Sequence, residues 1–333
     1  MTKVCICGGG SLGHVCAAVL SSQEGVEVRI LSGKPERWQQ RIEATDNDGR
    51  VFSGHIAKVS SNPADVVAGC DIVFLCLPGF MIARTLENIK PFVGEAVVGS
   101  IVSSTGFFFE AHRILGENAR LFGFQRTPFI ARVSEYGRSA NLLGYKPKVY
   151  VAVENVADRE AFRQTVEHLW ITPTILLDNF YQAALTNSNP ILHTGRLYTM
   201  FCGHETDVFD HNILFYKEWT DEASQMLIDM DAEFFQLLDK IGVDGIPTLL
   251  DYYESHDAAS LTRKISSIAA FQTILSPMKE TDGGWVADFN SRYFTEDFPY
   301  GLAFIKSLCD KHGIPAPHIT KVLQWALPHT TQK

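Results

Sequence analysis

Eleven histidines occur in this chain of 333 residues, and one of them lies in a segment suited to acid–base chemistry. The imidazole is the side chain that most readily exchanges a proton near neutral pH. His193 lies in residues 187–196, NSNPILHTGR, where polar side chains flank an apolar pair. A helix that begins near Pro190 would place His193 and Arg196 on one face, because residues three apart are neighbours on a helix. His193 is therefore the candidate acid or base.

A second segment, residues 290–301, carries NSRYFTEDFPYG, in which charged side chains lie among aromatic rings. Buried charges of this kind need partners. In one interpretation Asp297 orients the imidazole of His193, while Arg292 holds a substrate carboxylate. In the other, Arg292 forms a structural ion pair with Glu296 or Asp297 and caps a helix. The pattern alone leaves both interpretations open.

The N-terminus carries a glycine turn, Gly8-x-Gly10-x-x-Gly13, between a short apolar run and a helical pattern. The first glycine suits a tight turn, the second lets the backbone approach a pyrophosphate, and the third permits close packing of helix on strand. The unpaired N–H groups at the start of the helix bind phosphate. This context predicts a dinucleotide site. Its predicted phosphate contacts are Gly8, Gly10, Ser11, Leu12 and Gly13.

The end of the second predicted strand bears on the choice between NAD and NADP. NAD enzymes usually have an acidic residue there, which holds the ribose 2′-hydroxyl. This chain has Ser32 instead, with Lys34 and Arg37 close behind it. A hydroxyl and two cations would accept a 2′-phosphate, although both cations could also be solvated loop charges. The pattern favours NADP over NAD.

Strands and helices alternate along the first half of the chain, which predicts a doubly wound α/β sheet of Rossmann type over residues 1–178. Ligands of such sheets bind at the carboxyl ends of strands. Two turns occupy such positions, residues 76–79 and residues 103–106. Leu77 and Pro78 are expected beside the adenosine, and Ser103 and Thr105 on the nicotinamide side.

The pattern becomes helical after residue 178, with apolar residues three or four apart over residues 217–241. An all-α substrate and catalytic domain is therefore expected over residues 179–333. No Gly/Ser-rich linker separates the two domains, so a shared cleft is expected.

Composition excludes several classes of protein. The formal net charge of −9, without a basic run, disfavours nucleic acid as a partner. The sequence contains no run of about 18 apolar residues, so no membrane-spanning helix is expected. It also shows no signal sequence, so the protein is expected in the cytoplasm.

Two clusters could suggest a metal, and neither is expected to bind one. The pair Cys5-x-Cys7 has no partner pair of cysteines or histidines, and alternate strand residues share one buried face. The run His204 to His211 lacks H-E-x-x-H spacing.

Taken together, the GxGxxGxxxA turn, the NxNxILH segment and the RYFTEDFPYG segment resemble the opine dehydrogenases, the octopine/nopaline dehydrogenase family. The run FYKEW at residues 215–219 and the C-terminal segment from Gly301 also resemble that family's second domain, which is of the 6-phosphogluconate dehydrogenase-like kind. The resemblance covers nearly the whole chain.

This resemblance implies an enzyme that joins the amine of an amino acid to an α-keto acid and reduces the imine with NAD(P)H. It implies that His193 is the acid–base residue, that Asp297 is its partner, and that Arg292 binds a substrate carboxylate. Asn189 and Arg196, on the same predicted helix as His193, are further candidates for binding substrate. The family's NAD-using members typically have an acid after the second strand. Ser32 departs from that pattern, so NADP is expected rather than NAD.

Two rival interpretations remain open. A ketopantoate reductase-like enzyme would reduce a single keto acid and use a lysine, for which Lys217 and Lys264 are candidates. A non-catalytic NADP-binding sensor would need no pairing of His193 with Asp297. The expected partners are small molecules, together with a second copy of the chain in a homodimer, and the sequence does not choose the amino acid or the keto acid.

Overall fold

A computed structural model describes residues 1–104 and 106–330, which divide into a first unit, Met1–Thr186, and a second unit that begins at Asn187. The sequence analysis set the division at residues 178 and 179. Helix α6 (Phe180–Ala184) lies beyond that point and still belongs to the first unit. It does so because it contacts two strands of the sheet, Leu121–Phe124 and Val149–Glu154, and because Ala183 is buried in the first unit's core.

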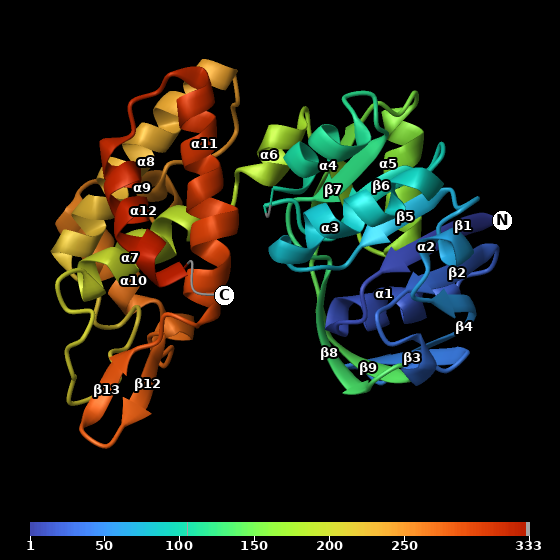
Figure 1. Ribbon diagram of the computed structural model, residues 1–333, viewed down its shortest axis with the longest axis horizontal. Coiled ribbons are helices and arrows are strands. Elements are labelled where there is room, and N and C mark those ends of the chain that lie inside the picture. The colour runs from blue at the N-terminus through green and yellow to red at the C-terminus, as the bar shows by residue number, and fades with distance from the viewer. Residues whose placement is uncertain (105, 331–333) are drawn as a thin grey trace. The chain divides into compact units, whose positions relative to one another are not determined.

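The first unit is a doubly wound α/β sheet, as predicted (Figure 1). Its strands lie in the order β11-β10-β7-β6-β5-β1-β2-β4-β3-β9-β8. The strands are β1 (Thr2–Cys7), β2 (Val26–Leu31), β3 (Arg41–Asp46), β4 (Val51–Ser60), β5 (Ile72–Leu75), β6 (Val97–Ser100), β7 (Leu121–Phe124), β8 (Phe129–Glu135), β9 (Ser139–Tyr145), β10 (Val149–Glu154) and β11 (Thr174–Leu176). The central pairings of β1 with β2 and β5 are parallel, so their carboxyl ends share one edge.

Helices cover both faces of this sheet. They are α1 (Ser11–Ser21), α2 (Pro63–Val66), α3 (Gly79–Ile89), α4 (Phe107–Leu115), α5 (Arg159–Leu169) and α6, with short 3₁₀ turns η1 (Pro35–Arg37) and η2 (Lys90–Phe92). Helices α1 and α5 pack on one core, and α2, α3 and α4 on the other. Cys5 and Cys7 alternate with Val4 and Ile6 along β1 and are buried in the second core. The sequence analysis expected this of the two thiols.

The sequence analysis did not foresee the hairpin of β8 and β9. These strands pair antiparallel, and β9 joins β3 in parallel, which extends the sheet by two strands. Helix α1 packs against the hairpin. Residues 129–145 therefore reach the segment that follows the glycine turn.

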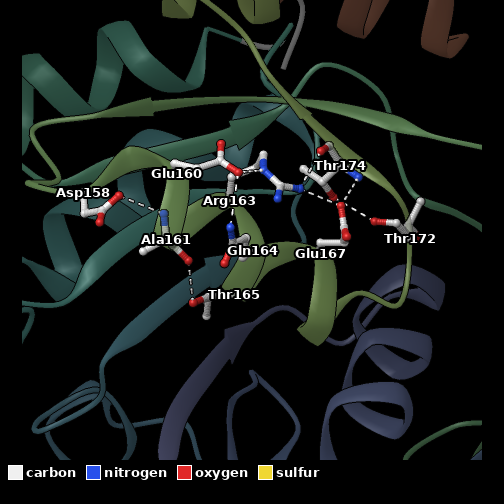
Figure 2. Close-up of polar contacts among 9 residues, drawn as sticks. All are labelled: Asp158, Glu160, Ala161, Arg163, Gln164, Thr165, Glu167, Thr172 and Thr174. Atoms are coloured by element: carbon white, nitrogen blue, oxygen red, sulfur yellow. Dashed lines mark hydrogen bonds and ion pairs between the residues drawn. The ribbon is translucent and has the colours of Figure 1, made fainter.

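Helix α5 is held to β11 by a polar network (Figure 2). Arg163 donates to Glu160 and Glu167 at 2.7 and 2.6 Å and to the Thr174 carbonyl oxygen at 2.9 Å. The Glu167 carboxylate also accepts the Thr174 N–H, which lowers the pKa of Glu167. The helix begins at Arg159 because the Asp158 carboxylate accepts the Ala161 N–H.

The second unit is mainly helical. Its elements are α7 (Asn189–Phe201), α8 (Asp221–Ile241), α9 (Leu249–Tyr252), α10 (Ala258–Ser267), η3 (Ala269–Phe271), β12 (Met278–Thr281), β13 (Gly284–Ala287), η4 (Tyr293–Leu302), α11 (Ala303–His312) and α12 (Pro317–Thr330). The long helix starts later than residue 217 because the Thr220 hydroxyl caps it, and it ends at Gly242, which has a φ of 67°. The hairpin of β12 and β13 is an addition to the all-α domain that the sequence predicts. Across the described ranges, no helix is long and apolar enough to cross a membrane.

Candidate active site

The glycine turn joins β1 to α1. Gly8 has a φ of +125°, and a Cβ on it would lie 2.5 Å from the Cys76 carbonyl oxygen. A Cβ on Gly13 would clash with the Gly8 carbonyl oxygen, whereas one on Gly10 would meet nothing within 4 Å. The first and third glycines are thus needed for packing, and the second leaves space beside the helix. No side chain caps the start of α1, so its first N–H groups are available to a phosphate.

The β8–β9 hairpin is tied to this turn. The Ser11 hydroxyl accepts the Val133 N–H at 3.1 Å. His14 is fully buried, with Nδ1 2.9 Å from the Gly10 carbonyl oxygen and Nε2 2.7 Å from the Gly137 N–H. Burial lowers the pKa of His14, so the ring is neutral, donating from Nδ1 and accepting at Nε2. The turn is therefore held by residues more than a hundred positions away.

A pocket of about 380 Å³ lies beside the turn, lined by residues that include Gly8, Gly9, Ser32, Leu77 and Arg84. The structure thus brings Leu77 and Ser32 to the glycine turn, in agreement with the topological argument. The Arg84 guanidinium, from α3, is exposed. The sequence analysis missed Arg84, since nothing in its local pattern separates it from other surface arginines.

Ser32 is 5 % exposed, and its hydroxyl oxygen accepts two hydrogen bonds. They come from Trp38 Nε1–H at 3.1 Å and from the backbone N–H of Lys34 at 3.2 Å, and the Tyr136 hydroxyl lies 3.4 Å from the same oxygen. The Lys34 and Arg37 side chains are exposed, and the Arg37 guanidinium lies 4.5 Å from the centre of the Tyr136 ring. Both cations therefore stand near the end of β2.

The remaining predicted cofactor residues have different environments. Pro78 is half-buried and immediately precedes α3. Ser103 is fully buried, and its hydroxyl has no partner within the described ranges. Thr105 lies outside the described residues.

In the second unit, α7 and η4 bring His193 and Asp297 together. His193 Nδ1 lies 2.8 Å from the Asp297 carboxylate, although the residues are 104 positions apart. The two helices approach closely because Gly301 lies against Pro190, where a Cβ would come within 2.8 Å. Residues 293–302 form a π-helix, a form found often at functional sites. Asp297 pairs with His193 rather than with Arg292.

The other nitrogen of His193 has a partner that the sequence analysis did not identify. Nε2 lies 3.0 Å from the hydroxyl of Tyr216. Tyr216 is 8 % exposed and follows Phe215 in the segment between α7 and α8. In the sequence the two rings have the pattern of core packing, and no local signal marks the hydroxyl.

The three predicted substrate-binding residues differ in exposure. Asn189 is half-buried, one helical turn before His193 on α7. Arg292 is exposed at the start of η4, without an ion pair in the part of the chain that the structure describes. Arg196 is 3 % exposed and donates to the carbonyl oxygens of Phe215 at 3.3 Å and Glu218 at 2.7 Å. Burial lowers the pKa of Arg196 to about 10.

The rival candidates lie on the surface. Lys217 is exposed, and Lys264 forms a 2.5 Å ion pair with Glu254. In the run His204 to His211, the exposed His204 side chain pairs with the Asp207 carboxylate. The exposed His211 side chain pairs with the carboxylates of Asp210 and Glu218. Residues 1–104 and 106–330 contain no group of three or more His, Cys, Asp or Glu side chains that could hold a metal ion.

Both units match family models. Residues 176–329 match the NAD/NADP octopine/nopaline dehydrogenase alpha-helical domain, and residues 4–106 match ketopantoate reductase PanE/ApbA. The tauropine dehydrogenase of Arabella iricolor is 29 % identical over 98 % of this chain and 91 % of its own length. An octopine dehydrogenase structure with NADH and L-arginine has a TM-score of 0.88 at 24 % identity, covering 98 % of this chain and 89 % of that one.

An NADP⁺-bound yersinopine dehydrogenase structure has a TM-score of 0.77 at 14 % identity, covering 99 % of this chain and 91 % of that one. A dinucleotide-binding sheet followed by a helical unit with a histidine–aspartate pair defines the class, a nicotinamide-dependent oxidoreductase. The match of the helical unit and the relatives along nearly the whole chain support an opine dehydrogenase family for this protein. It is an NAD(P)-dependent oxidoreductase that acts on CH–NH bonds.

Proposed function

We propose that this enzyme condenses an amino acid with an α-keto acid and reduces the resulting imine with NADPH, and that it also catalyses the reverse oxidation. The observation that carries the proposal is the hydrogen bond between His193 and Asp297. A carboxylate can only accept, so Nδ1 carries the proton and Nε2 is the basic nitrogen of the neutral ring. Asp297 also stabilises the imidazolium that forms when Nε2 takes a proton.

The chain's own residues divide the remaining work. Arg292, exposed at the start of η4, would bind a substrate carboxylate, since a guanidinium matches a carboxylate with two parallel hydrogen bonds. Asn189 would bind substrate on the same helical face as His193. Arg196 donates to backbone carbonyl oxygens, so we assign it to holding residues 215–218 and not to a substrate.

The first unit fits the dinucleotide that this reaction needs. Gly10 leaves open space beside the uncapped start of α1, where a pyrophosphate would be held. The Ser11 and Ser32 hydroxyls and the Leu77 side chain would border it. A bound nicotinamide supplies the hydride.

Ser32 supports NADP over NAD as the cofactor. Both acceptor positions of its oxygen are used by Trp38 and Lys34, so the hydroxyl can only donate, and only the 3.4 Å contact with the Tyr136 hydroxyl competes with a cofactor for its proton. A phosphate oxygen accepts such a proton, whereas a ribose 2′-hydroxyl would lack an acceptor for its own hydrogen. The exposed Lys34, Arg37 and Arg84 side chains add positive charge for a 2′-phosphate.

The test is NADPH oxidation with pyruvate alone, with L-arginine alone and with both, followed by other amino acids. Dependence on both substrates is expected, and mass spectrometry should detect the condensed secondary amine. Turnover with the keto acid alone would instead indicate a simple reductase. Absence of turnover across the panel would favour a sensor. Lys217 is exposed and Lys264 is paired with Glu254, whereas His193 is paired with Asp297, which favours the condensing enzyme over the reductase.

Compartment and assembly are further proposals. The chain has seven free thiols, and Cys202 is exposed, which suits the reducing cytoplasm. Cell fractionation tests that location. A homodimer is the expected assembly, and light scattering on the purified protein tests it.

A further inference from the structure

Asp297, His193 and Tyr216 form one hydrogen-bonded chain within the second unit. The Asp297 carboxylate lies 2.8 Å from Nδ1 of His193, and the Tyr216 hydroxyl lies 3.0 Å from Nε2. His193 is 9 % exposed, and both of its ring nitrogens have a partner inside the protein. A substrate therefore meets no free ring nitrogen in this arrangement.

The direction of each hydrogen bond follows from the groups. Nδ1 must donate because the carboxylate only accepts, and Nε2 of a neutral ring must then accept from the Tyr216 O–H. Burial raises the pKa of Tyr216 well above its ordinary value, which keeps the phenol protonated. The phenol oxygen retains the capacity to accept another proton.

Tyr216 is held firmly in this position. Its ring stacks on Phe271 with centroids 4.5 Å apart and lies 8° from parallel to Trp219. Arg196 binds the backbone carbonyl oxygens of Phe215 and Glu218, on either side of Tyr216. A hydroxyl fixed in this way keeps its contact with Nε2 without reorganisation, which suits proton transfer.

We propose that Tyr216 is a further catalytic residue, which relays the proton between the substrate and Nε2 of His193. This inference rests on the proposed function. As the amino acid's ammonium loses its proton, an N–H bond breaks and an O–H bond forms on Tyr216. The original Tyr216 proton passes in the same event to Nε2, and the free amine attacks the keto carbon. One proton then moves from the new C–N nitrogen to the former carbonyl oxygen, which gives the carbinolamine.

The reverse relay serves dehydration. Nε2 returns its proton to the Tyr216 oxygen, and the phenol proton passes to the hydroxyl of the carbinolamine. The carbon–oxygen bond then breaks, water leaves, and the protonated imine remains. One proton is taken up and given back, so Tyr216 and His193 end in their starting forms.

The first experiment compares wild type with Tyr216→Phe, which keeps the ring and removes the relay oxygen. We expect kcat to fall by about 100-fold or more, the usual effect of losing an acid–base group. NADPH affinity, measured by fluorescence, should stay within about threefold, because binding uses the first unit. Tyr253→Phe is the matched control, a buried tyrosine of the same unit outside this chain of hydrogen bonds, and should keep normal turnover.

A second variant separates a relay from a supporting role. Fluorotyrosine at position 216 preserves the ring and the hydroxyl and makes the phenol more acidic. A relay predicts that the pH–rate profile moves to lower pH and that the solvent deuterium isotope effect changes. A profile that superimposes on wild type would overturn the relay.

These results also separate the two proposals. If the wild type shows no condensation of a keto acid with an amine, the proposed function and the relay both fail. If the wild type condenses and Tyr216→Phe turns over normally, the relay alone fails, and His193 acts directly through Nε2.

Discussion

At Ser32, two hydrogen bonds arrive from within the protein, one from the indole of Trp38 and one from the Lys34 amide. The Ser32 hydroxyl can then only donate, either to a cofactor oxygen or across the 3.4 Å contact to the Tyr136 hydroxyl. The Trp38 N–H therefore limits what Ser32 can recognise. Cofactor selectivity here depends on a buried partner as well as on the exposed cations.

The variant Trp38→Phe removes the indole N–H and keeps an aromatic ring beside His14, 4.3 Å away in the native stack. Ser32 would then be free to accept from a ribose hydroxyl. We expect the NADPH/NADH ratio of kcat/KM to fall by about 3–10-fold, the value of one hydrogen bond. Trp325→Phe is the control, because it removes an indole hydrogen bond to Glu205 in the second unit. An unchanged ratio in Trp38→Phe would contradict this account of Ser32.

The variants His193→Ala and Asp297→Asn test the pair itself. His193→Ala should lose about 10²–10⁴-fold in kcat while NADPH still binds. Asp297→Asn should lose less, because the asparagine amide can still hold Nδ1 but cannot stabilise the imidazolium. His256→Ala, at an exposed histidine of the same unit, serves as the control. Near-normal turnover in His193→Ala would remove this histidine from the mechanism.

At the scale of elements, the contact of α7 with η4 sets the distance between His193 and Asp297. Gly301→Ala would place a Cβ within 2.8 Å of Pro190, whose ring has little freedom to move. We expect kcat to fall with a loss of stability of about 1–3 kcal/mol. Gly283→Ala, whose Cβ would have Val208 at 3.7 Å as its nearest neighbour, should behave as wild type. If Gly301→Ala and Gly283→Ala changed kcat and stability to the same extent, the close contact between Gly301 and Pro190 would not be critical.

Helix α8 carries Asp231, a carboxyl that is 7 % exposed and accepts the Leu249 N–H at 2.8 Å. Burial raises the pKa of Asp231 from 3.8 to about 6. The folded state therefore binds this proton more tightly, so its contribution to the free energy of unfolding is fully present below about pH 4 and is lost as pH rises through about 6.

Asp231→Asn should remove that dependence while still accepting the amide hydrogen. We expect the variant to match wild type near pH 4 and to exceed it by about 1–3 kcal/mol at pH 8. Urea unfolding across this range measures the difference. Asp239→Asn, at an exposed carboxyl of the same helix, should leave the pH dependence unchanged. A constant difference between Asp231→Asn and wild type at every pH would refute the assignment.

Local patterns were sufficient for part of the fold and site. The glycine turn was predictable because its spacing, strand and helix are contiguous, and the alternation of elements predicted the doubly wound sheet that the structure has. His193 and Asp297 were paired in advance from residue type and from family resemblance. Tyr216 was not, because the chain between α7 and α8 has no regular pattern, and an aromatic run looks the same whether its hydroxyl is used or not.

The β8–β9 hairpin was missed for a related reason. The alternation of buried and exposed residues is typical of a strand but does not indicate which edge of the sheet that strand joins. Here β9 pairs with β3, which lies about a hundred residues earlier in the chain. The hydrogen bond from the Trp38 indole to the Ser32 hydroxyl likewise depends on how η1 turns the chain back toward the end of β2. Sequence patterns report on one element, whereas these features depend on packing between elements.

For the whole molecule, cofactor binding should appear as added stability. A ligand that binds only the folded state at 100 times its Kd adds about 2.7 kcal/mol, so NADPH should raise Tm, and by more than NADH at equal concentration. Gly10→Ala should keep the Tm of the free protein, since its Cβ meets nothing within 4 Å, and should abolish the NADPH effect by filling the space for the pyrophosphate. A full NADPH effect in Gly10→Ala would exclude that position for the phosphates.

The hydrogen bonds from Val133 to Ser11 and from Gly137 to His14 have a consequence for the order of folding. They close loops of 122 and 123 residues, and contacts of such high order form late, because the entropy of loop closure must be met first. A nascent chain that ends before Phe129 can pair β1 with β2 and β5 but lacks the hairpin that holds the turn. The ability to bind the nucleotide should therefore appear later than the sheet during refolding. The glycine turn becomes a binding site only after the β8–β9 hairpin has packed against it.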